Sequence, residues 1–360
     1  MKTLKGVPNG MKKIKLEGNS YDIGFKHGKY LKESIRFNLS LIQNQGSKVW
    51  NGLSYVKSSQ VITENTKFLK EFYPNYLDEM KGISDGSGLS FKKILKLNIL
   101  PFDWLRTFGP EECTQLAVKN VKGQWILAKT RDLGTEMIHV LLDRSLENSK
   151  RTLEVGVAGS ILWPGSGINE NGLTVGSSGV WSRTMSINYE EANSHFILPS
   201  MHVILELCNG IRELRDCGAK YVPSLTGINM VAADTADAAA FEFGINNIVE
   251  FRARSEDTFL ARTNHYIAKE LTKWSPSPKE NPSSYEREAF LDLTLPHFHF
   301  TSDEEILQVI SSHNNFPQNS ICRHKTGNGK GSQTIYGSIS NPLERRLIVF
   351  NGNPCKWLNL

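Results

Sequence analysis

The sequence predicts an α+β fold in which sheets are covered by helices on their outer faces. Apolar residues in the first hundred positions recur with a helical period. From Cys113 the period changes to the alternation of strands, and helical blocks interrupt the strands that follow. Strands and helices mixed in this way pack as layers around a shared core.

The composition is that of an ordinary globular protein. The 360 residues are 39% hydrophobic and 22% charged, which excludes a disordered, collagen-like or coiled-coil chain. A formal charge of +5 is too small to indicate a nucleic-acid partner. The first 50 residues hold ten basic and three acidic side chains, a local +7. We interpret this excess as a solvated surface, with an anion or membrane contact as the alternative.

No stretch reaches the roughly 18 consecutive apolar residues that span a bilayer. Residues 1–15 lack the apolar region of a secretory signal. The five cysteines are odd in number, widely spread and without a Cys-x-x-Cys pair, so we expect neither a disulfide framework nor a zinc site. We therefore expect a cytoplasmic protein with reduced thiols, and leave the oligomeric state open.

The first hundred residues are predicted to be mainly helical. Ser20 can cap a helix that runs to about residue 45, with one apolar stripe formed by Leu31, Ile35, Leu39 and Ile42. A second helix is predicted at residues 58–72, and Ser90 caps a third. The segment 108–112, Phe-Gly-Pro-Glu-Glu, then breaks the helical pattern.

Strands dominate after this break. Residues 114–121 and 124–130 are predicted to form a hairpin that turns at Lys122-Gly123. Further strands are predicted at 152–157, 173–178, 228–234, 239–243, 248–254, 259–263, 334–340 and 346–350. Helices are predicted at 201–216, 284–293 and 304–311, the last after the capping-box pattern Ser302-x-x-Glu305, and a surface loop at 273–284. No clean domain boundary is visible.

Common catalytic signatures are absent. The chain has no Gly-x-Ser-x-Gly elbow and no His-Glu-x-x-His helix, and its Gly-rich run at 327–331 lacks the ending of a phosphate loop. His297 and His299 have no third ligand nearby, so we interpret them as a surface or packed pair. We therefore expect neither a metal nor a cofactor.

Cys113 is the most informative position, because it opens the first predicted strand of the sheet region. The predicted hairpin brings Arg131 and Asp132 back beside it, where a charged pair can orient a nucleophile. Asn264 ends another predicted strand and can supply an amide to an oxyanion hole. The alternatives are a buried structural cysteine, an ordinary strand-end ion pair and a turn-forming asparagine.

A family resemblance rests on several motifs in a shared order. They are Cys113-Thr114, Arg131-Asp132, Gly167-Ile168-Asn169-Glu170-Asn171-Gly172-Leu173, Thr263-Asn264-His265, Ser320-Ile321-Cys322-Arg323 and the final strand pair. Together they resemble the acyl-CoA:6-aminopenicillanic acid acyltransferase (isopenicillin N acyltransferase) family of N-terminal-nucleophile hydrolases. The resemblance runs from Ile23-Gly24-x-x-His27-Gly28 to Pro354, and we expect His27-Gly28 to pack a helix.

The resemblance implies a four-layer αββα sandwich of two antiparallel sheets between helix layers. It also implies self-cleavage between Glu112 and Cys113, into a helical segment 1–112 and a catalytic core 113–360 that share one fold. The resemblance thus implies that the uncleaved chain is an inactive precursor, a zymogen. After cleavage the new α-amine, with a pKa of about 8, can act as general base for its own thiol.

The resemblance assigns further roles by position. Asp132 would orient the Cys113 amine, Arg131 would polarise the thiol, and Asn264 would bind the oxyanion. Thr226, Ser177 and Ser178 are expected to line the substrate pocket. The chain departs from the family at Glu112, where a glycine is usual, by one extra residue before Asp132, and at Gly331, where a basic residue is usual and Lys330 or Arg323 are the substitutes.

We therefore expect an autoprocessed cysteine amidohydrolase or N-acyltransferase that acts on a small non-peptide amide through a Cys113 thioester. Its partner is a small-molecule amide or acyl donor, including acyl-CoA. One alternative is acyl-CoA-dependent transfer as the main activity, and another is a silent ligand-binding scaffold in which Glu112 blocks processing. A bile-salt or penicillin V acylase-like enzyme is disfavoured, because those enzymes carry the nucleophile near the start of the chain.

Overall fold

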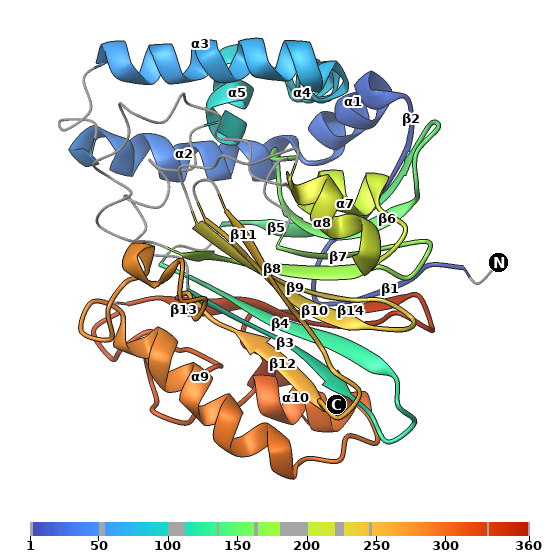
Figure 1. Ribbon diagram of the computed structural model, residues 1–360. Coiled ribbons are helices and arrows are strands. Elements are labelled where there is room, and N and C mark those ends of the chain that lie inside the picture. Colours follow the sequence, from blue (N-terminus) through green and yellow to red (C-terminus); the bar gives the residue numbers. More distant parts are fainter. Residues whose placement is uncertain are drawn as a thin grey trace.

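The computed structural model describes two stacked sheets between two layers of helices (Figure 1). It describes residues 3–49, 55–99, 112–134, 137–161, 165–180, 201–219, 227–244, 247–329 and 331–358. The predicted four-layer α+β sandwich is confirmed. None of the helices in these ranges is both long enough and apolar enough to cross a membrane.

The described part of the first sheet has six strands in the order β1-β14-β13-β4-β3-β12. Its strands are β1 Lys5–Asn9, β3 Glu112–Lys119, β4 Trp125–Leu133, β12 Phe259–Arg262, β13 Gln333–Asn341 and β14 Arg346–Asn351. All neighbours pair antiparallel except β1 and β14, which are parallel. The N-terminal segment thus adds the edge strand to this sheet.

The second sheet has eight described strands in the order β11-β10-β9-β8-β7-β6-β5-β2. They are β2 Lys13–Gly18, β5 His139–Leu146, β6 Thr152–Val157, β7 Ser166–Asn169, β8 Thr174–Val180, β9 Gly227–Ala233, β10 Ala238–Phe243 and β11 Ile248–Arg252. Only β2 and β5 pair parallel. The predicted antiparallel sheets are therefore present, each extended by one parallel edge strand from the N-terminal segment.

Helices cover the outer face of each sheet (Figure 1). On the eight-stranded side lie α1 Ser20–Tyr30, α2 Lys32–Val49, α3 Tyr55–Phe72, α4 Pro74–Ser87, α5 Phe91–Ile99, α7 Met201–Leu207 and α8 Ile211–Ala219. On the six-stranded side lie α9 Pro282–Thr294 and α10 Asp303–Ile310. The predicted capping box is present, since Ser302 and Glu305 bond each other's backbone at the start of α10.

Several predicted boundaries were wrong. The single helix predicted at 20–45 is two helices, because Leu31 leaves helical geometry with φ −116° and ψ 17°. The helix predicted at 201–216 is likewise interrupted, between α7 and α8. The structure adds α4 and strands β1, β2, β5 and β7, which were not predicted. Of the predicted break at 108–112, residues 108–111 lie outside the described residues.

The apolar core follows from strand alternation, which gives each sheet two different faces. Between the eight-stranded sheet and its helices lie Leu16, Ile35, Ile83, Val140 and Val175. Between the six-stranded sheet and α9 and α10 lie Leu116, Ile126, Leu291 and Ile310. Between the two sheets lie Leu141, Leu153, Val349, Ala117 and Val231. The start of β3 is therefore covered on both of its faces.

Candidate active site

The β3–β4 hairpin brings together the residues that the sequence singled out. In its antiparallel register Cys113 pairs with Arg131, and Glu112 pairs with Asp132. The turn lies at Lys122-Gly123, where Gly123 adopts a left-handed φ of 73° that favours glycine. The predicted return of Arg131-Asp132 to the side of Cys113 is therefore confirmed.

Strand alternation sends the side chains of this pair of strands to opposite faces. Gln115 donates a hydrogen bond to Ser178 in the eight-stranded sheet, at 2.9 Å. Cys113 lies two residues earlier and faces the same sheet. Glu112 and Asp132 face the layer of α9 and α10 instead. The thiol and the predicted orienting carboxylate thus approach the start of β3 from its two sides.

Cys113 is completely buried, and its backbone N–H and its carbonyl oxygen are each held by a side chain. Its backbone N–H donates to Oδ1 of Asn264 at 2.8 Å. Its carbonyl oxygen accepts a hydrogen bond from Nη1 of Arg287 at 2.5 Å. The atoms around the predicted scissile bond are therefore fixed by side chains from two other elements.

Asn264 reaches Cys113 because β12 pairs with β3, with Arg262 opposite Gln115. Because the two strands are antiparallel, the same register continued by two residues sets Asn264 opposite Cys113. Ser284 of α9 accepts the backbone N–H of Asn264 at 2.8 Å and also lies 2.8 Å from Nδ1 of His265. The side-chain amide of Asn264 donates to the carbonyl of Gly179 at 2.8 Å. The turn that carries Asn264 is thus held by α9 and by the end of β8.

Arg287 of α9 was not predicted, although it bonds both the backbone of Cys113 and the side chain of Asn264. Its guanidinium donates to Thr114 Oγ1 at 2.8 Å and to Asn264 Oδ1 at 2.9 Å, in addition to the Cys113 carbonyl. It is 1% exposed, and burial lowers the pKa of Arg287 despite the neighbouring Glu112. A signal existed in the sequence, because Arg287 stands four residues before buried Leu291 on one helical face.

The carboxylate of Glu112 lies between two arginines. It pairs with Arg323 and lies 3.4 Å from Nη2 of Arg287. Of the two basic residues named as substitutes for the one missing at Gly331, Arg323 therefore reaches the site. Lys330 lies outside the described residues.

Asp132 is a fully buried carboxylic acid. Its Oδ1 accepts a hydrogen bond from the hydroxyl of Thr334 at 2.7 Å. Burial raises the pKa of Asp132 to about 6, and the nearby charges of Arg323 and Arg287 oppose that rise. Its second oxygen, Oδ2, accepts no hydrogen bond within the described ranges. Oδ2 of Asp132 can therefore accept a hydrogen bond from a further donor.

Arg131 faces the gap between the sheets, on the same side as the Cys113 thiol. It adjoins Gly165 and Tyr336, where a side chain at residue 165 would meet both. Burial, together with the charge of Arg131, lowers the pKa of His139 to about 3. The imidazole of His139 therefore stays neutral near pH 7. Of these two side chains, only Arg131 places a positive charge beside Cys113.

The predicted pocket residues have different positions. Ser178 is buried, and its hydroxyl donates to the Thr263 carbonyl at 2.5 Å, next to Asn264. The Ser177 carbonyl accepts a hydrogen bond from Lys129, across the two sheets. Thr226 lies outside the described residues. Ser178 thus supports the turn of Asn264, and a substrate contact for these serines stays a prediction.

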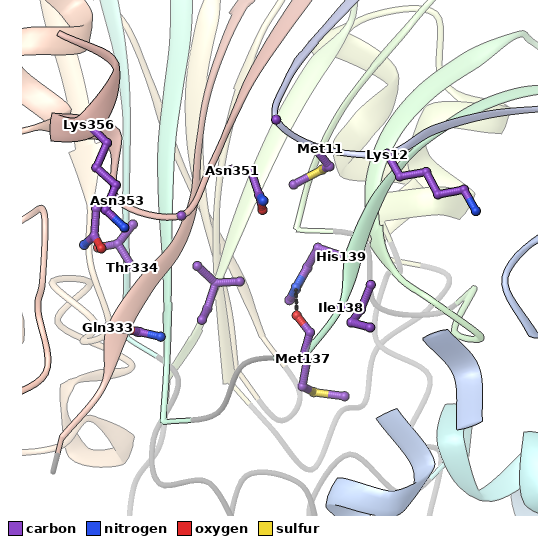
Figure 2. Close-up of a pocket in the computed structure, with 13 residues that line it drawn as sticks. Met11, Lys12, Met137, Ile138, His139, Gln333, Thr334, Asn351, Asn353 and Lys356 are labelled. Atoms are coloured by element: carbon purple, nitrogen blue, oxygen red, sulfur yellow. Dashed lines mark hydrogen bonds between the residues drawn. The ribbon is translucent and has the colours of Figure 1, made fainter. Parts of the chain in front are cut away.

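A cavity of about 490 Å³ lies beside Thr334 (Figure 2). Its wall includes Thr334, whose hydroxyl reaches Asp132, and His139. Two lysines, Lys12 and Lys356, line it as well. None of Cys113, Asn264, Ser177 and Ser178 lines this cavity. The cavity therefore meets the site through Thr334 and not at the thiol.

Comparison with known proteins agrees with this geometry. Residues 119–356 match the family described as acyl-coenzyme A:6-aminopenicillanic acid acyl-transferase. The chain is also similar to the acyl-coenzyme A:6-aminopenicillanic-acid-acyltransferase 40 kDa form of Emericella nidulans, with 22% identity over 95% of this chain and 92% of that protein. Because the match spans well over half of its length, this chain belongs to the acyl-coenzyme A:6-aminopenicillanic acid acyl-transferase family.

Proposed function

We propose that the protein is a cysteine N-terminal-nucleophile enzyme that cleaves itself between Glu112 and Cys113. The observation that carries the proposal is the environment of Cys113: its N–H donates to Asn264 at 2.8 Å, and Asp132 lies opposite the preceding residue, Glu112, in the strand register. Family membership supports acyl transfer as the reaction class. The processed enzyme transfers an acyl group from a small linear amide to water or to an amine.

Self-cleavage begins when the Cys113 sulfur attacks the carbonyl carbon of Glu112. A carbon–sulfur bond forms, the carbon–nitrogen bond breaks, and the thiol proton ends on the freed Cys113 amine. Water then adds to the thioester, which restores the thiol and leaves a carboxylate on Glu112. Arg287 supports this step, because its bond to the Cys113 carbonyl fixes the strand while the amide rotates out of plane.

The new N-terminus then serves as the base. The α-amine takes the thiol proton, the thiolate attacks the substrate carbonyl, and the protonated amine returns that proton to the leaving amine. Water or an acceptor amine opens the thioester by the same sequence in reverse. Oδ2 of Asp132 is buried and without a hydrogen bond in the described structure, so we assign it to hold the new ammonium group.

Asn264 and Arg131 have supporting roles. Asn264 contacts the peptide nitrogen of Cys113 through its acceptor Oδ1, so binding an oxyanion requires its amide to turn and present Nδ2, which here donates to the Gly179 carbonyl. Arg131 faces the same side as the thiol and favours the thiolate. We propose a small-molecule amide or acyl donor as partner, and acyl-CoA is supported by the name of the related fungal enzyme. The cytoplasm is the proposed location, because none of the described cysteines is paired in a disulfide.

Intact-protein mass spectrometry tests the cleavage. The purified chain is expected to give two fragments, residues 1–112 and 113–360, while a Cys113→Ala variant stays at 40.4 kDa. Cys217→Ala is the matched control, because this cysteine lies in α8 and forms no disulfide, and its replacement should leave cleavage intact. Cleavage in Cys113→Ala would remove the proposal.

Activity is then measured on a panel of N-acyl amides, with and without amine acceptors. Acyl product is expected only from cleaved protein, and the acceptor arm separates transfer from hydrolysis. One observation favours an uncleaved ligand-binding scaffold. Arg287 and Arg323 both contact the carboxylate of Glu112 and so restrain the residue before the fully buried Cys113. A single 40.4 kDa species whose Cys113 does not react with iodoacetamide would support the scaffold.

A further inference from the structure

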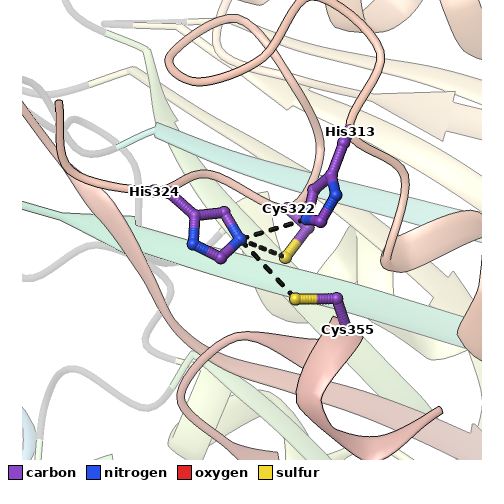
Figure 3. Close-up of side chains that lie close together, drawn as sticks. All are labelled: His313, Cys322, His324 and Cys355. Atoms are coloured by element: carbon purple, nitrogen blue, oxygen red, sulfur yellow. Dashed lines mark hydrogen bonds between the residues drawn. The ribbon is translucent and has the colours of Figure 1, made fainter. Parts of the chain in front are cut away.

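We propose that His313, Cys322, His324 and Cys355 form a structural zinc site. These four side chains point toward one another (Figure 3). Each offers one ligand atom, and the four atoms lie within 4.8 Å of one another. The inference does not depend on the proposed function, and no residue of the cluster was assigned a role in it.

The distances within the cluster are those of a zinc tetrahedron. Zinc binds thiolate sulfur at about 2.3 Å and imidazole nitrogen at about 2.0–2.1 Å, so tetrahedral ligand atoms lie about 3.3–3.8 Å apart. Nε2 of His324 lies 3.7 Å from Sγ of Cys322 and 3.6 Å from Sγ of Cys355. It lies 3.1 Å from Nε2 of His313. All three separations fall within a few tenths of an ångström of that geometry.

The donor set selects the metal. Two thiolates and two imidazoles in a tetrahedral arrangement favour zinc over the hard cations that prefer oxygen. Four protein ligands leave no open position, which indicates a structural rather than a catalytic site. His313 is exposed, so the metal has an entry path from solvent.

Asn353 supports the ligand Cys322 from outside the cluster. Nδ2 of Asn353 lies 3.6 Å from Sγ of Cys322, and the same side chain donates to the Arg323 carbonyl at 2.5 Å. Hydrogen bonds of this kind from an outer residue orient the ligands of metal sites. The arrangement thus has both a ligand set and a supporting shell.

The site joins a loop to the C-terminal segment of the described chain. His313, Cys322 and His324 lie between α10 and β13, and Cys355 lies in the short helix Pro354–Trp357 after β14. Arg323 stands between two of the ligands and reaches Glu112. A bound zinc ion would therefore fix the loop that places this arginine at the start of β3.

The absence of a zinc site was expected from the sequence because the cysteines are widely spaced and no Cys-x-x-Cys pair exists. The spacing argument applies to local zinc motifs, whereas this cluster forms only after β13 and β14 fold back on the loop. The competing interpretation is a disulfide between Cys322 and Cys355. It leaves unexplained why two imidazoles converge on the same point.

Metal analysis of the full-length protein, folded with zinc present and then dialysed, tests the proposal. About one zinc ion per chain is expected in the wild type, and less than about one-tenth of that in the Cys322→Ser/Cys355→Ser double variant. His297→Ala and Cys217→Ser are matched controls, because both residues lie outside the cluster, and both variants should keep the metal. Zinc retained by the double variant would overturn the site.

Cobalt exchange gives a second readout that survives poor folding of the cysteine variants. In the wild type, Co²⁺ should produce the strong visible absorption of a tetrahedral ion and a thiolate charge-transfer band. His313→Ala changes an exposed ligand and should weaken Co²⁺ binding at least tenfold, while far-UV circular dichroism stays unchanged. A wild type without either metal, or with a Cys322–Cys355 disulfide after folding with zinc, would refute the proposal.

Discussion

At the scale of single residues, Asp132 shows how burial and charge compete at the candidate active site. Two guanidinium groups favour its carboxylate form, but burial dominates and raises its pKa to about 6. One of its oxygens accepts from Thr334, and the other accepts nothing from the described residues. Such an acid costs stability when ionised, which is typical of groups retained for chemistry.

Replacing Asp132 by asparagine should reveal this cost in the pH dependence of stability. The folded protein binds a proton that the unfolded chain releases near pH 4, so its free energy of unfolding falls as pH rises from about 4 to about 6. Asp132→Asn removes that loss. Between pH 4 and pH 7.5, the free energy of unfolding of the variant should therefore rise by up to about 3 kcal/mol relative to that of the parent.

Urea unfolding at the two pH values measures this difference. Both proteins should carry Cys113→Ala, so that cleavage does not change the unfolding species. A stability difference that stays constant with pH would contradict the shifted pKa of Asp132.

Arg287 is the second residue whose environment makes a clear prediction. It is buried and bonds the Cys113 carbonyl, Thr114 and Asn264, and Glu112 lies beside it. Arg287→Leu leaves these acceptors without their donor and should lower the free energy of unfolding by about 3 kcal/mol or more. It should also abolish cleavage, as seen by mass spectrometry.

The control for Arg287 is Arg254→Leu, since Arg254 pairs with Asp257 on the surface. That variant should unfold and cleave like the parent. Normal cleavage in a folded Arg287→Leu protein would show that this arginine does not position Cys113.

At the scale of elements, α1 and α4 pack with their backbones in contact. A side-chain carbon at Gly24 would lie 2.0 Å from the carbonyl oxygen of Glu79, and one at Gly28 would lie 2.3 Å from that of Ile83. Backbone atoms cannot move aside as the end of a flexible side chain can. The next residue before Gly28 also has a packing role, because Nε2 of His27 accepts the Gly159 N–H at 2.9 Å. The expected packing role of His27-Gly28 is thereby confirmed.

Gly24→Ala should therefore separate the two helices and destabilise the protein by about 3 kcal/mol. Gly327→Ala is the matched control, because no atom lies within 4 Å of the added carbon there, and it should change stability by only a few tenths of a kcal/mol. Thermal unfolding of the two variants makes the comparison. Equal melting temperatures would contradict the close contact of α1 and α4.

At the scale of the whole molecule, a buried ion pair joins the two sides of the proposed cleavage point. Arg144 of β5 donates to both carboxylate oxygens of Glu79 in α4, at 2.6 and 2.8 Å. Both side chains are 1% exposed. Strands β1 and β2 also join the two sheets built mainly from later residues. After cleavage the two fragments should thus stay associated and elute as one species in gel filtration.

Glu79→Gln should weaken this junction. Arg144 would lose its closest carboxylate and keep the more distant ones of Glu206 at 3.5 Å and Glu154 at 3.8 Å, so we expect the free energy of unfolding in urea to fall by about 3 kcal/mol. Asp85→Asn on the same helix is the control, because its pair with Lys81 is at the surface and should contribute nothing measurable. Equal losses in the two variants would contradict the role of burial.

Much of the fold was open to prediction because its signals are local. The β3–β4 hairpin depends on one turn and two alternating strands, and it correctly placed Arg131 and Asp132 beside Cys113. The capping box at Ser302 is equally local. Strand β2 was missed although Ile14 and Leu16 alternate with charged residues, because it lies at a sheet edge and pairs with a distant strand.

By itself, the sequence determined the layered class, the order of most elements and the hairpin that carries the candidate nucleophile. Only the tertiary structure decided that Arg287 and Arg323 reach Glu112, and that His313, Cys322, His324 and Cys355 meet. The physical reason is how far apart along the chain the interacting residues lie. Helix periods and turns arise from residues a few positions apart, whereas these clusters form between segments whose separation along the chain leaves no local pattern.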